Sequence, residues 1–257
     1  MREPLNVQAA WEIRWLLQEK YGGEMTKQAK DDIRRLERGE PVDYVIGWVD
    51  FLGCRIDLSA RPFIPRPETE YWVGKTIEDI QAAGTKKAIR CLDVFAGSGC
   101  IGMALLCHLP HALIDFAEKE GAELRQIEMN VKLNGIGGSR YQMIQSDVCS
   151  SLERGRNYDY IFANPPYIAQ KRKRSAQKSV LEWEPDAALF GKADGLYYIT
   201  ILLEEAKNYL AKEGKMYIEF DSPQKAQITS LLRHYGYAKT RFSKDQYGRW
   251  RWVEASY

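Results

Sequence analysis

The sequence predicts a doubly wound α/β fold built on a sheet of seven strands, and three observations lead to this prediction. From residue 88 onward, short apolar segments alternate with longer segments of helical periodicity, which is typical of parallel strands joined by right-handed crossovers. The last two apolar segments, 237–243 and 249–256, are separated only by KDQYG. That loop is too short for a crossover, so these strands should pair antiparallel. With 257 residues, 45% of them hydrophobic, the chain can bury a full core.

Residues 1–40 are expected to form a short helical N-terminal region. Apolar residues recur at helical spacing over 6–20, and a second helix should begin after Thr26, a residue type that favours the N-cap. This second helix should end at Gly39, just before Pro41. Two helices of this length cannot build a core of their own, so we expect them to pack against the rest of the chain.

Residues 41–65 are expected to form a β-hairpin that links this region to the main domain. An apolar run precedes Gly53, and strict alternation of apolar and polar residues follows it, the pattern of two short paired strands. The segment IPRPETE at 64–70 then leads into a helix. The main domain should therefore span 66–257.

The main domain should contain five parallel strands before the terminal antiparallel pair. We expect these strands at 88–95, 112–117, 140–145, 158–163 and 215–220, with helices between them at 99–108, 120–134, 196–212 and 223–235.

The composition argues against several classes of protein. No apolar run approaches the roughly 18 residues of a membrane helix, and the N-terminus lacks the apolar core of a signal peptide. We therefore expect a cytoplasmic protein without membrane contact. The five cysteines form no CxxC pair and the three histidines complete no ligand set, so we expect free thiols and no metal. The net charge of +2 is weak for a nucleic-acid binder.

A glycine-rich loop follows the first strand of the main domain. Residues 93–102 read DVFAGSGCIG, a literal GxGxxG, which taken alone predicts a dinucleotide enzyme. However, the carboxylate of Asp93 at the strand end would repel a pyrophosphate. It suits a ligand that has an amino group and no phosphate, such as S-adenosylmethionine, which the glycines would allow to approach the backbone closely.

Further acids stand at the ends of the next two strands. Glu118 is placed to bind ribose hydroxyls, with Asp115 as its competitor, and Asp147 could accept from an adenine amino group. Because doubly wound sheets bind ligands at the carboxyl ends of their strands, we expect these side chains to share one crevice. The expected cofactor-binding residues are Asp93, Phe95, Ala96, Gly97, Ser98, Gly99, Glu118, Asp147, Val148 and Asn164.

The fourth strand in this crevice ends in Asn164-Pro165-Pro166-Tyr167. An amide or exocyclic amine nitrogen is a poor nucleophile, so a site that methylates one must hold the NH₂ group in place. The Asn164 side-chain oxygen and the Pro165 carbonyl can each accept one N–H, the two prolines stiffen that geometry, and Tyr167 can stack on the planar group. These four residues are the expected catalytic residues. Glutamine amides, adenine N6 and cytosine N4 all present such a nitrogen, so the motif leaves the substrate open.

Several separated motifs together resemble one known family, the release-factor glutamine N5-methyltransferases (HemK/PrmC type). These motifs are IPRPETE (64–70), NPPYI (164–168), Glu184-Pro185, Ala188-Leu189, Gly191, Asp194-Gly195-Leu196 and the closing pattern Asp245, Gly248, Arg251. The resemblance covers roughly 41–257 and implies a Rossmann-like methyltransferase fold. It also implies transfer of a methyl group from S-adenosylmethionine to the glutamine of the Gly-Gly-Gln loop of a peptide chain release factor, the expected partner.

The resemblance also bears on individual residues. It places the ribose-binding acid on Glu118, and it adds Arg66 and Glu184 to Asn164, Pro165 and Tyr167 as substrate-binding residues. The chain departs from the family at Phe95-Ala96, where Gly-Thr or Gly-Cys is usual, and in its short N-terminal region.

Two alternative substrates remain at this point, a glutamine of a ribosomal protein and an adenine amino group of a nucleic acid. The chain shows no target-recognition domain, so nucleic-acid contact is expected only through the basic loop Lys171–Arg174. We expect a monomer.

Overall fold

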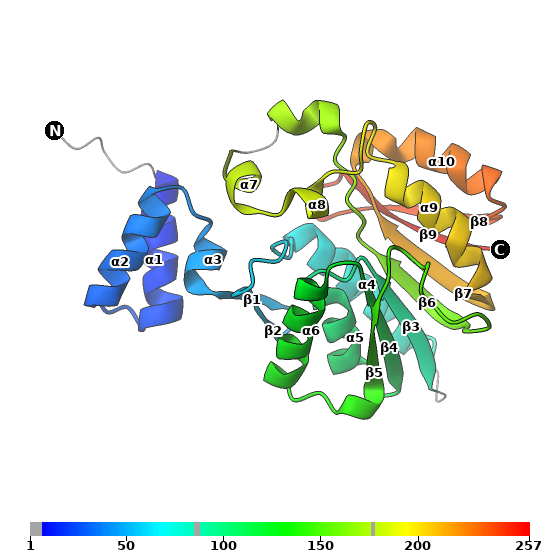
Figure 1. Cartoon of the computed structure of the whole chain (residues 1–257), viewed down its shortest axis with the longest axis horizontal. Coiled ribbons are helices and arrows are strands. Elements are labelled where there is room, and N and C mark those ends of the chain that lie inside the picture. Colours follow the sequence, from blue (N-terminus) through cyan, green and yellow to red (C-terminus); the bar gives the residue numbers. More distant parts are fainter. Residues whose placement is uncertain (1–6, 85–87, 176–177) are drawn as a thin grey trace.

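The computed structural model describes residues 7–84, 88–175 and 178–257, and within them the chain folds into a seven-stranded sheet and a separate two-stranded sheet (Figure 1). The α-helices are α1 (Val7–Tyr21), α2 (Lys27–Glu37), α3 (Val42–Ile46), α4 (Pro67–Ala82), α5 (Cys100–His108), α6 (Gly121–Leu133), α7 (Lys178–Trp183), α8 (Asp186–Leu189), α9 (Tyr197–Glu205) and α10 (Lys225–His234). The strands are β1 (Trp48–Phe51), β2 (Cys54–Asp57), β3 (Ile89–Val94), β4 (Ala112–Glu118), β5 (Tyr141–Gln145), β6 (Tyr158–Ala163), β7 (Leu210–Glu219), β8 (Lys239–Lys244) and β9 (Trp250–Ser256).

The large sheet confirms the predicted doubly wound fold. Its strand order is β5-β4-β3-β6-β7-β9-β8, with the first five strands parallel and both pairings of β9 antiparallel. The chain moves outward from β3 to β5 and then returns to place β6 on the other side of β3. The carboxyl ends of β3 and β6 therefore flank the topological switch point, where such sheets bind ligands.

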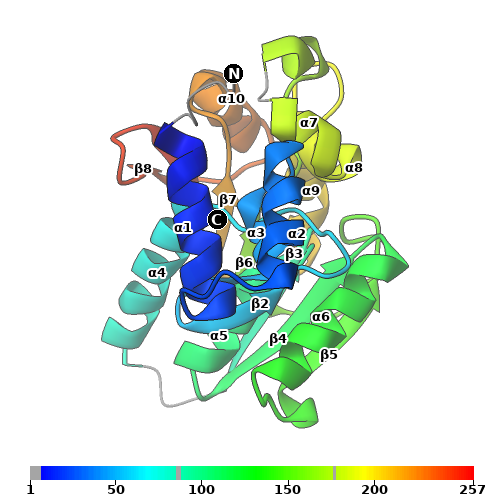
Figure 2. The same ribbon diagram turned by 90° about the vertical axis from the view of Figure 1, so that its left-hand side faces the viewer.

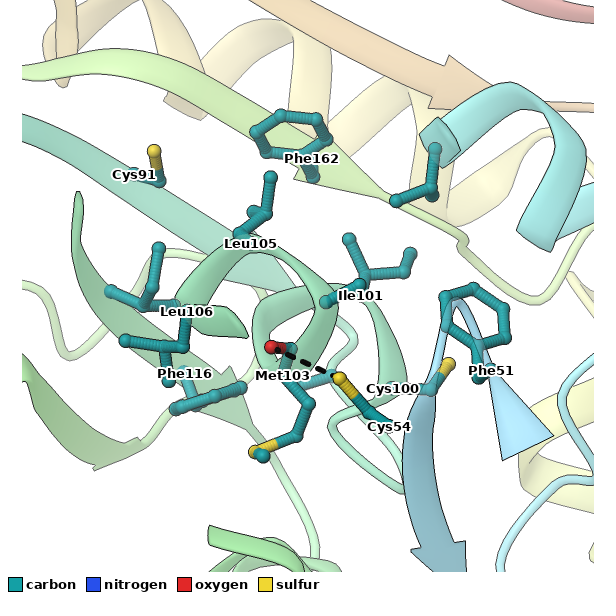
Figure 3. Packing of buried hydrophobic residues seen from close by; sticks show 14 of the residues in the cluster. Phe51, Cys54, Cys91, Cys100, Ile101, Met103, Leu105, Leu106, Phe116 and Phe162 are labelled. Atoms are coloured by element: carbon teal, nitrogen blue, oxygen red, sulfur yellow. Dashed lines mark hydrogen bonds between the residues drawn. The ribbon is translucent and has the colours of Figure 1, made fainter. Parts of the chain in front are cut away.

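Helices cover both faces of this sheet, because successive strand residues point to opposite sides. On β6, Phe162 packs into the core that contains α4, α5 and α6, whereas Ile161 and Ala163 pack into the core beneath α9 and α10. The two-stranded hairpin closes the first of these cores. There Phe51 and Cys54 lie against α5, and the Cys54 thiol donates to the Met103 carbonyl at 3.7 Å (Figure 3).

Two of the expected boundaries were wrong. The helix expected at 196–212 ends at Glu205, and a short 3₁₀ turn (Ala206–Asn208) leads into β7, which begins at Leu210. The helix ends early because the Tyr158 N–H at the start of β6 donates to the Tyr209 carbonyl at 2.7 Å, which draws this segment into the sheet. Part of the expected hairpin, Val42–Ile46, forms α3 instead and is ended by Gly47, whose φ is +98°.

As expected, α1 and α2 do not build a core alone, and they pack against the following segment, where α3 completes a small core with them. Leu16 of α1 is fully buried among the apolar residues of α3. Asp32 of α2 accepts hydrogen bonds from Lys20 and Tyr21 of α1, at 2.8 and 2.6 Å. The three helices lie together at one side of the molecule (Figures 1 and 2). Within the described ranges, no helix is both long and apolar enough to cross a bilayer.

Candidate active site

A cavity of about 400 Å³ opens at the carboxyl ends of the parallel strands. Its wall includes the loop after β3, residues of 118–123 at the end of β4 and the start of α6, the segment 146–148 after β5 and the segment 164–168 after β6. Residues of 63–69 and 180–189 and Tyr198 of α9 complete it. The structure thus brings together most of the residues expected at the site. Those in the wall are Arg66, Phe95, Ala96, Gly97, Ser98, Glu118, Asp147, Val148, Asn164, Pro165, Pro166 and Tyr167, whereas Asp93, Gly99 and Glu184 are not part of it.

The glycine loop curves tightly between β3 and α5. Phe95, Gly97 and Gly99 all have positive φ, at +60°, +53° and +77°. Gly102 serves packing instead, because a Cβ there would lie 2.1 Å from the ring of Phe116 on β4. In this GxGxxG sequence, Gly97 and Gly99 allow the turn, whereas Gly102 allows α5 to pack close to the sheet.

Asp93 lies beneath this loop and not in the cavity wall. Its side chain is fully buried, and Oδ2 accepts the Gly102 N–H at 2.9 Å. Burial raises the pKa of Asp93 to about 8. Oδ1 is buried and has no hydrogen-bond partner among the described residues. Asp93 therefore anchors the start of α5 and leaves one buried oxygen, directly behind the glycine loop, without a partner in the described part of the chain.

The two candidate ribose acids have different surroundings. Glu118 lies in the cavity wall, where Oε2 accepts the Gly97 N–H at 2.9 Å and Oε1 accepts the Lys119 N–H at 2.7 Å. Asp115 is paired instead with Arg156 at 2.5 Å and with the Tyr158 hydroxyl at 2.7 Å. This geometry favours Glu118, whose carboxylate is fixed by backbone donors at the cavity edge.

The segment after β5 forms another side of the cavity. Asp147 is half-exposed and forms an ion pair with Lys119 at 2.8 Å. Val148 is buried with a φ of +54°, an unfavourable conformation for a β-branched residue. Backbone strain of this kind is concentrated at ligand sites.

The Asn-Pro-Pro-Tyr tip is held from behind. Asn164 Nδ2 donates to the Thr69 hydroxyl at 3.3 Å, and the Tyr167 hydroxyl donates to Glu219 Oε1 at 2.9 Å. Burial raises the pKa of Tyr167 well above its ordinary value. Sequence reasoning did not assign a role to Thr69 or Glu219, although Thr69 stands within the IPRPETE segment.

The segment 191–195 packs tightly against the back of this tip. A Cβ on Gly191 would lie 2.3 Å from the Pro166 carbonyl oxygen, and one on Gly195 would lie 2.0 Å from the Tyr167 carbonyl oxygen. Gln224 Nε2 donates to that same Tyr167 oxygen at 2.9 Å. Gly191 and Gly195 therefore allow the backbone of 191–195 to pack directly against the backbone of Pro166 and Tyr167.

Arg66 and Glu184 form an ion pair at 2.5 Å. Glu184 is buried and also accepts the Ile64 N–H at 3.2 Å, whereas Arg66 is partly exposed in the cavity wall. Glu184 therefore joins the 64–70 segment to the end of α7, and Arg66 is the member of the pair that a substrate can reach.

The basic loop begins with a 3₁₀ segment, Gln170–Ser175. Arg172 pairs with Asp221, and Lys173 pairs with Asp186 at 2.6 Å. These ion pairs offset two of the positive charges. The side chain of Arg174 lies outside the described part of the structure.

Glu123 is a wall residue that the sequence did not reveal. Its Oε2 is buried with no hydrogen-bond partner in the described ranges. Burial and the neighbouring Glu118 and Glu120 raise the pKa of Glu123 to about 7. Its position on the first turn of α6, five residues after Glu118, is the one signal that could have indicated it.

The cavity fits a nucleoside ligand with a positive charge. Its volume lies within the usual range of about 300–1,000 Å³ for ligand sites. It combines apolar surfaces from Phe95 and Val148 with four acidic residues, Glu118, Glu120, Glu123 and Asp147. Acids would disfavour a pyrophosphate here, and S-adenosylmethionine matches this set of groups.

Comparisons with known proteins identify methyltransferases as the relatives of this chain. Residues 77–184 match the family model of the methyltransferase small domain. The release factor glutamine methyltransferase of Coxiella burnetii is 31% identical over 223 residues, which cover 87% of this chain and 77% of the relative. The enzyme of that name from Streptococcus pneumoniae is 31% identical over 239 residues, which cover 92% of this chain and 82% of the relative.

Solved structures show the same fold. The catalytic domain of hMettl16, in complex with MAT2A 3'UTR hairpin 1, has a TM-score of 0.61 at 16% identity, over 99% of this chain and 91% of that one. The ribosomal protein L11 methylase of Lactobacillus delbrueckii subsp. bulgaricus has a TM-score of 0.52 at 17% identity, over 76% and 80% of the two chains. The sequence relatives, together with the Asn-Pro-Pro-Tyr tip at the cavity, lead to one conclusion: the chain belongs to the release factor glutamine methyltransferase family.

Proposed function

We propose that this protein transfers the methyl group of S-adenosylmethionine to the side-chain nitrogen of the glutamine in the Gly-Gly-Gln loop of a peptide chain release factor. The observation that carries the proposal is the position of Asn164, whose side chain lies at the edge of the cavity and is held by Thr69 through its nitrogen. The side-chain oxygen is thereby left to accept an N–H from a substrate.

The cofactor-binding part of the site is assigned to three segments. The glycine loop from Phe95 to Gly99 would hold the cofactor close to the backbone, Glu118 would accept from its ribose hydroxyls, and Asp147 with Val148 would line the adenine side. When bound, the cofactor supplies an electrophilic methyl group beside a positive sulfonium. The acids in the wall suit that charge.

Asn164 and its neighbours act on the substrate by orientation. The lone pair of a glutamine amide nitrogen is delocalised, so the site must fix the NH₂ group in one plane. Asn164 Oδ1 and the Pro165 carbonyl can each accept one of its two N–H bonds, and Tyr167 provides a flat apolar surface. Holding reacting groups in such a geometry is worth several kcal/mol in intramolecular reactions.

Substrate entry is assigned to the side of the cavity formed by Arg66 and the α7–α8 segment. Arg66 is tied to the buried Glu184 and so presents its guanidinium from a fixed position. A fixed guanidinium can donate several hydrogen bonds to the backbone carbonyls of a glycine-rich loop. The glycines of such a loop would let its glutamine reach past Arg66 to Asn164.

The proposal is tested by methyl transfer from labelled S-adenosylmethionine to a purified release factor. The matched control is the same factor with Gln→Ala in its Gly-Gly-Gln loop. We expect label on the wild-type factor and none on the variant. Label on both factors would place the modified residue elsewhere and contradict the proposal.

Two further arms address the alternative substrates with the same assay. Purified ribosomal proteins test a different protein glutamine, and DNA and RNA test adenine N6. Label on any of these, with none on the release factor, would contradict the proposed substrate while leaving methyl transfer intact.

A further inference from the structure

Glu219, at the carboxyl end of β7, joins two separate segments of the site. Its side chain is 1% exposed and accepts three hydrogen bonds. Oε2 accepts from the Thr69 hydroxyl and from Trp72 Nε1, both at 2.7 Å. Oε1 accepts from the Tyr167 hydroxyl at 2.9 Å. We call Thr69, Trp72, Tyr167 and Glu219 the Glu219 cluster.

The donors and acceptors of this cluster determine how Asn164 is turned. The indole of Trp72 can only donate, so Glu219 Oε2 is an acceptor. The Thr69 hydroxyl has a single proton and directs it to the same oxygen. Toward Asn164 it can therefore only accept, and it must be met by the NH₂ end of that amide, as the 3.3 Å contact shows. The opposite rotamer would place two oxygens against each other.

Positive charge supports the ionised form of Glu219. Burial raises the pKa of Glu219, and its three donors together with the positive charge of Arg251 oppose that rise. Arg251 is itself buried and donates to Asp245 Oδ2 at 3.0 Å. Asp245 and Arg251 belong to the β8–β9 hairpin on one side of β7, and the Asn-Pro-Pro-Tyr tip follows β6 on the other side. Glu219 links the two, because it faces the charge of Arg251 and accepts from Tyr167.

We propose that Thr69 and Glu219 are positioning residues for methyl transfer, which fix the Asn164 amide with its oxygen toward the substrate and hold the Tyr167 ring in place. The assignment of a substrate nitrogen to Asn164 rests on the proposed function. The orientation of the amide itself is a property of the free protein, so it can be measured separately.

The kinetic test compares Thr69→Val with Thr69→Ser. Valine has nearly the shape of threonine but no hydroxyl, so Asn164 loses the partner that sets its orientation. We expect kcat to fall by about 10²-fold, the cost of a misplaced catalytic group, with the affinity for S-adenosylmethionine changed less than about 3-fold. Serine restores the hydroxyl and should recover most of the lost kcat.

The second readout does not depend on methyl transfer. In protein labelled with ¹⁵N-asparagine, the Asn164 NH₂ group should give two well-separated proton resonances in the wild type and in Thr69→Ser. In Thr69→Val these resonances should shift and broaden as the amide becomes free to turn. If wild-type protein methylates no substrate, the proposed function fails, and these spectra still decide the positioning role.

Thermal unfolding of each variant identifies those that fold. If Thr69→Val does not fold, the smaller Thr69→Ala takes its place in both measurements. A folded variant without the hydroxyl that keeps the wild-type kcat and unshifted Asn164 resonances would overturn the proposal. A loss of kcat that Thr69→Ser does not recover would overturn it as well, because the effect would then depend on the methyl group and not on the hydroxyl.

Discussion

The substitution Gly191→Ala should displace the backbone of the Asn-Pro-Pro-Tyr tip, and its effect on kcat can be distinguished from the effect of a general loss of stability. Gly191 does not have a positive φ, so alanine meets no backbone strain there. Its Cβ would, however, lie 2.3 Å from the Pro166 carbonyl oxygen and 2.8 Å from the Gly195 carbonyl oxygen. Both neighbours are backbone atoms, which cannot turn away as the end of a flexible side chain can.

The size of the effect follows from these distances. Real Cβ contacts are essentially never shorter than 3.0 Å, so the 2.3 Å contact must open by about 0.7 Å. That displacement acts on the residue between Pro165 and Tyr167, whose neighbours are assigned to hold the substrate nitrogen. Because a shift of about 1 Å in a positioned group can cost about 10²-fold in rate, we expect kcat to fall by about 10- to 100-fold.

The matched control is Gly236→Ala, at the end of α10. Gly236 has a φ of +85°, and a Cβ there would meet nothing within 4 Å. Alanine therefore adds left-handed strain of about 1–2 kcal/mol without a clash, and the melting temperature should fall by a few degrees. The assay is single-turnover methyl transfer, with unfolding followed for both variants. Equal losses of kcat in the two variants, or a folded Gly191→Ala with wild-type kcat, would refute the reasoning.

Three further predictions concern residues expected from the sequence. Asn164→Ala should lower kcat by about 10²-fold or more with little change in S-adenosylmethionine affinity by calorimetry; loss of that affinity would mean that Asn164 serves the cofactor instead. Glu118→Ala should weaken cofactor binding, whereas Asp115→Ala should lower the melting temperature, because Arg156 and the Tyr158 hydroxyl each lose a hydrogen-bond partner; the reverse result would reassign the ribose acid. Because the pKa of Asp93 is raised to about 8 from its ordinary value of 3.8, the folded protein keeps a proton that the unfolded chain releases between these values. The free energy of unfolding should therefore fall as pH rises through this window, by up to about 1.4 kcal/mol per pH unit. In Asp93→Asn, urea unfolding at several pH values should show a weaker dependence of this free energy on pH.

The sheet could be predicted from the sequence because its signal is local. Each buried parallel strand is a short apolar segment between turn residues, and the order of strands and helices then limits the topology. The boundaries that were wrong depended on distant contacts. Residues 210–214 carry no clear strand pattern, and they join β7 because Tyr158 of β6 offers a backbone partner.

Apart from Arg66, which the family resemblance indicated, the candidate site could be predicted mainly for residues at or just after a strand end. Glu118, Asp147 and Asn164 were expected because a strand end fixes where they lie. Thr69 and Glu219 are separated by 150 positions, and their hydrogen bond exists only in the folded chain. The structure likewise corrects the environment expected for Asp93, since strand position alone does not say whether a carboxylate faces the cavity or the underside of a loop.

At Phe95 the glycine loop holds a bulky residue in a conformation that favours glycine. Where the family usually has glycine, Phe95 adopts the left-handed φ of +60° that glycine would take without strain. The conformation costs a non-glycine residue about 1–2 kcal/mol. Its ring packs edge-on against Tyr198 of α9 at 5.8 Å, a contact worth about 0.5–1.5 kcal/mol. The ring contact therefore offsets much of the strain, and the phenyl ring adds apolar surface to the cavity wall.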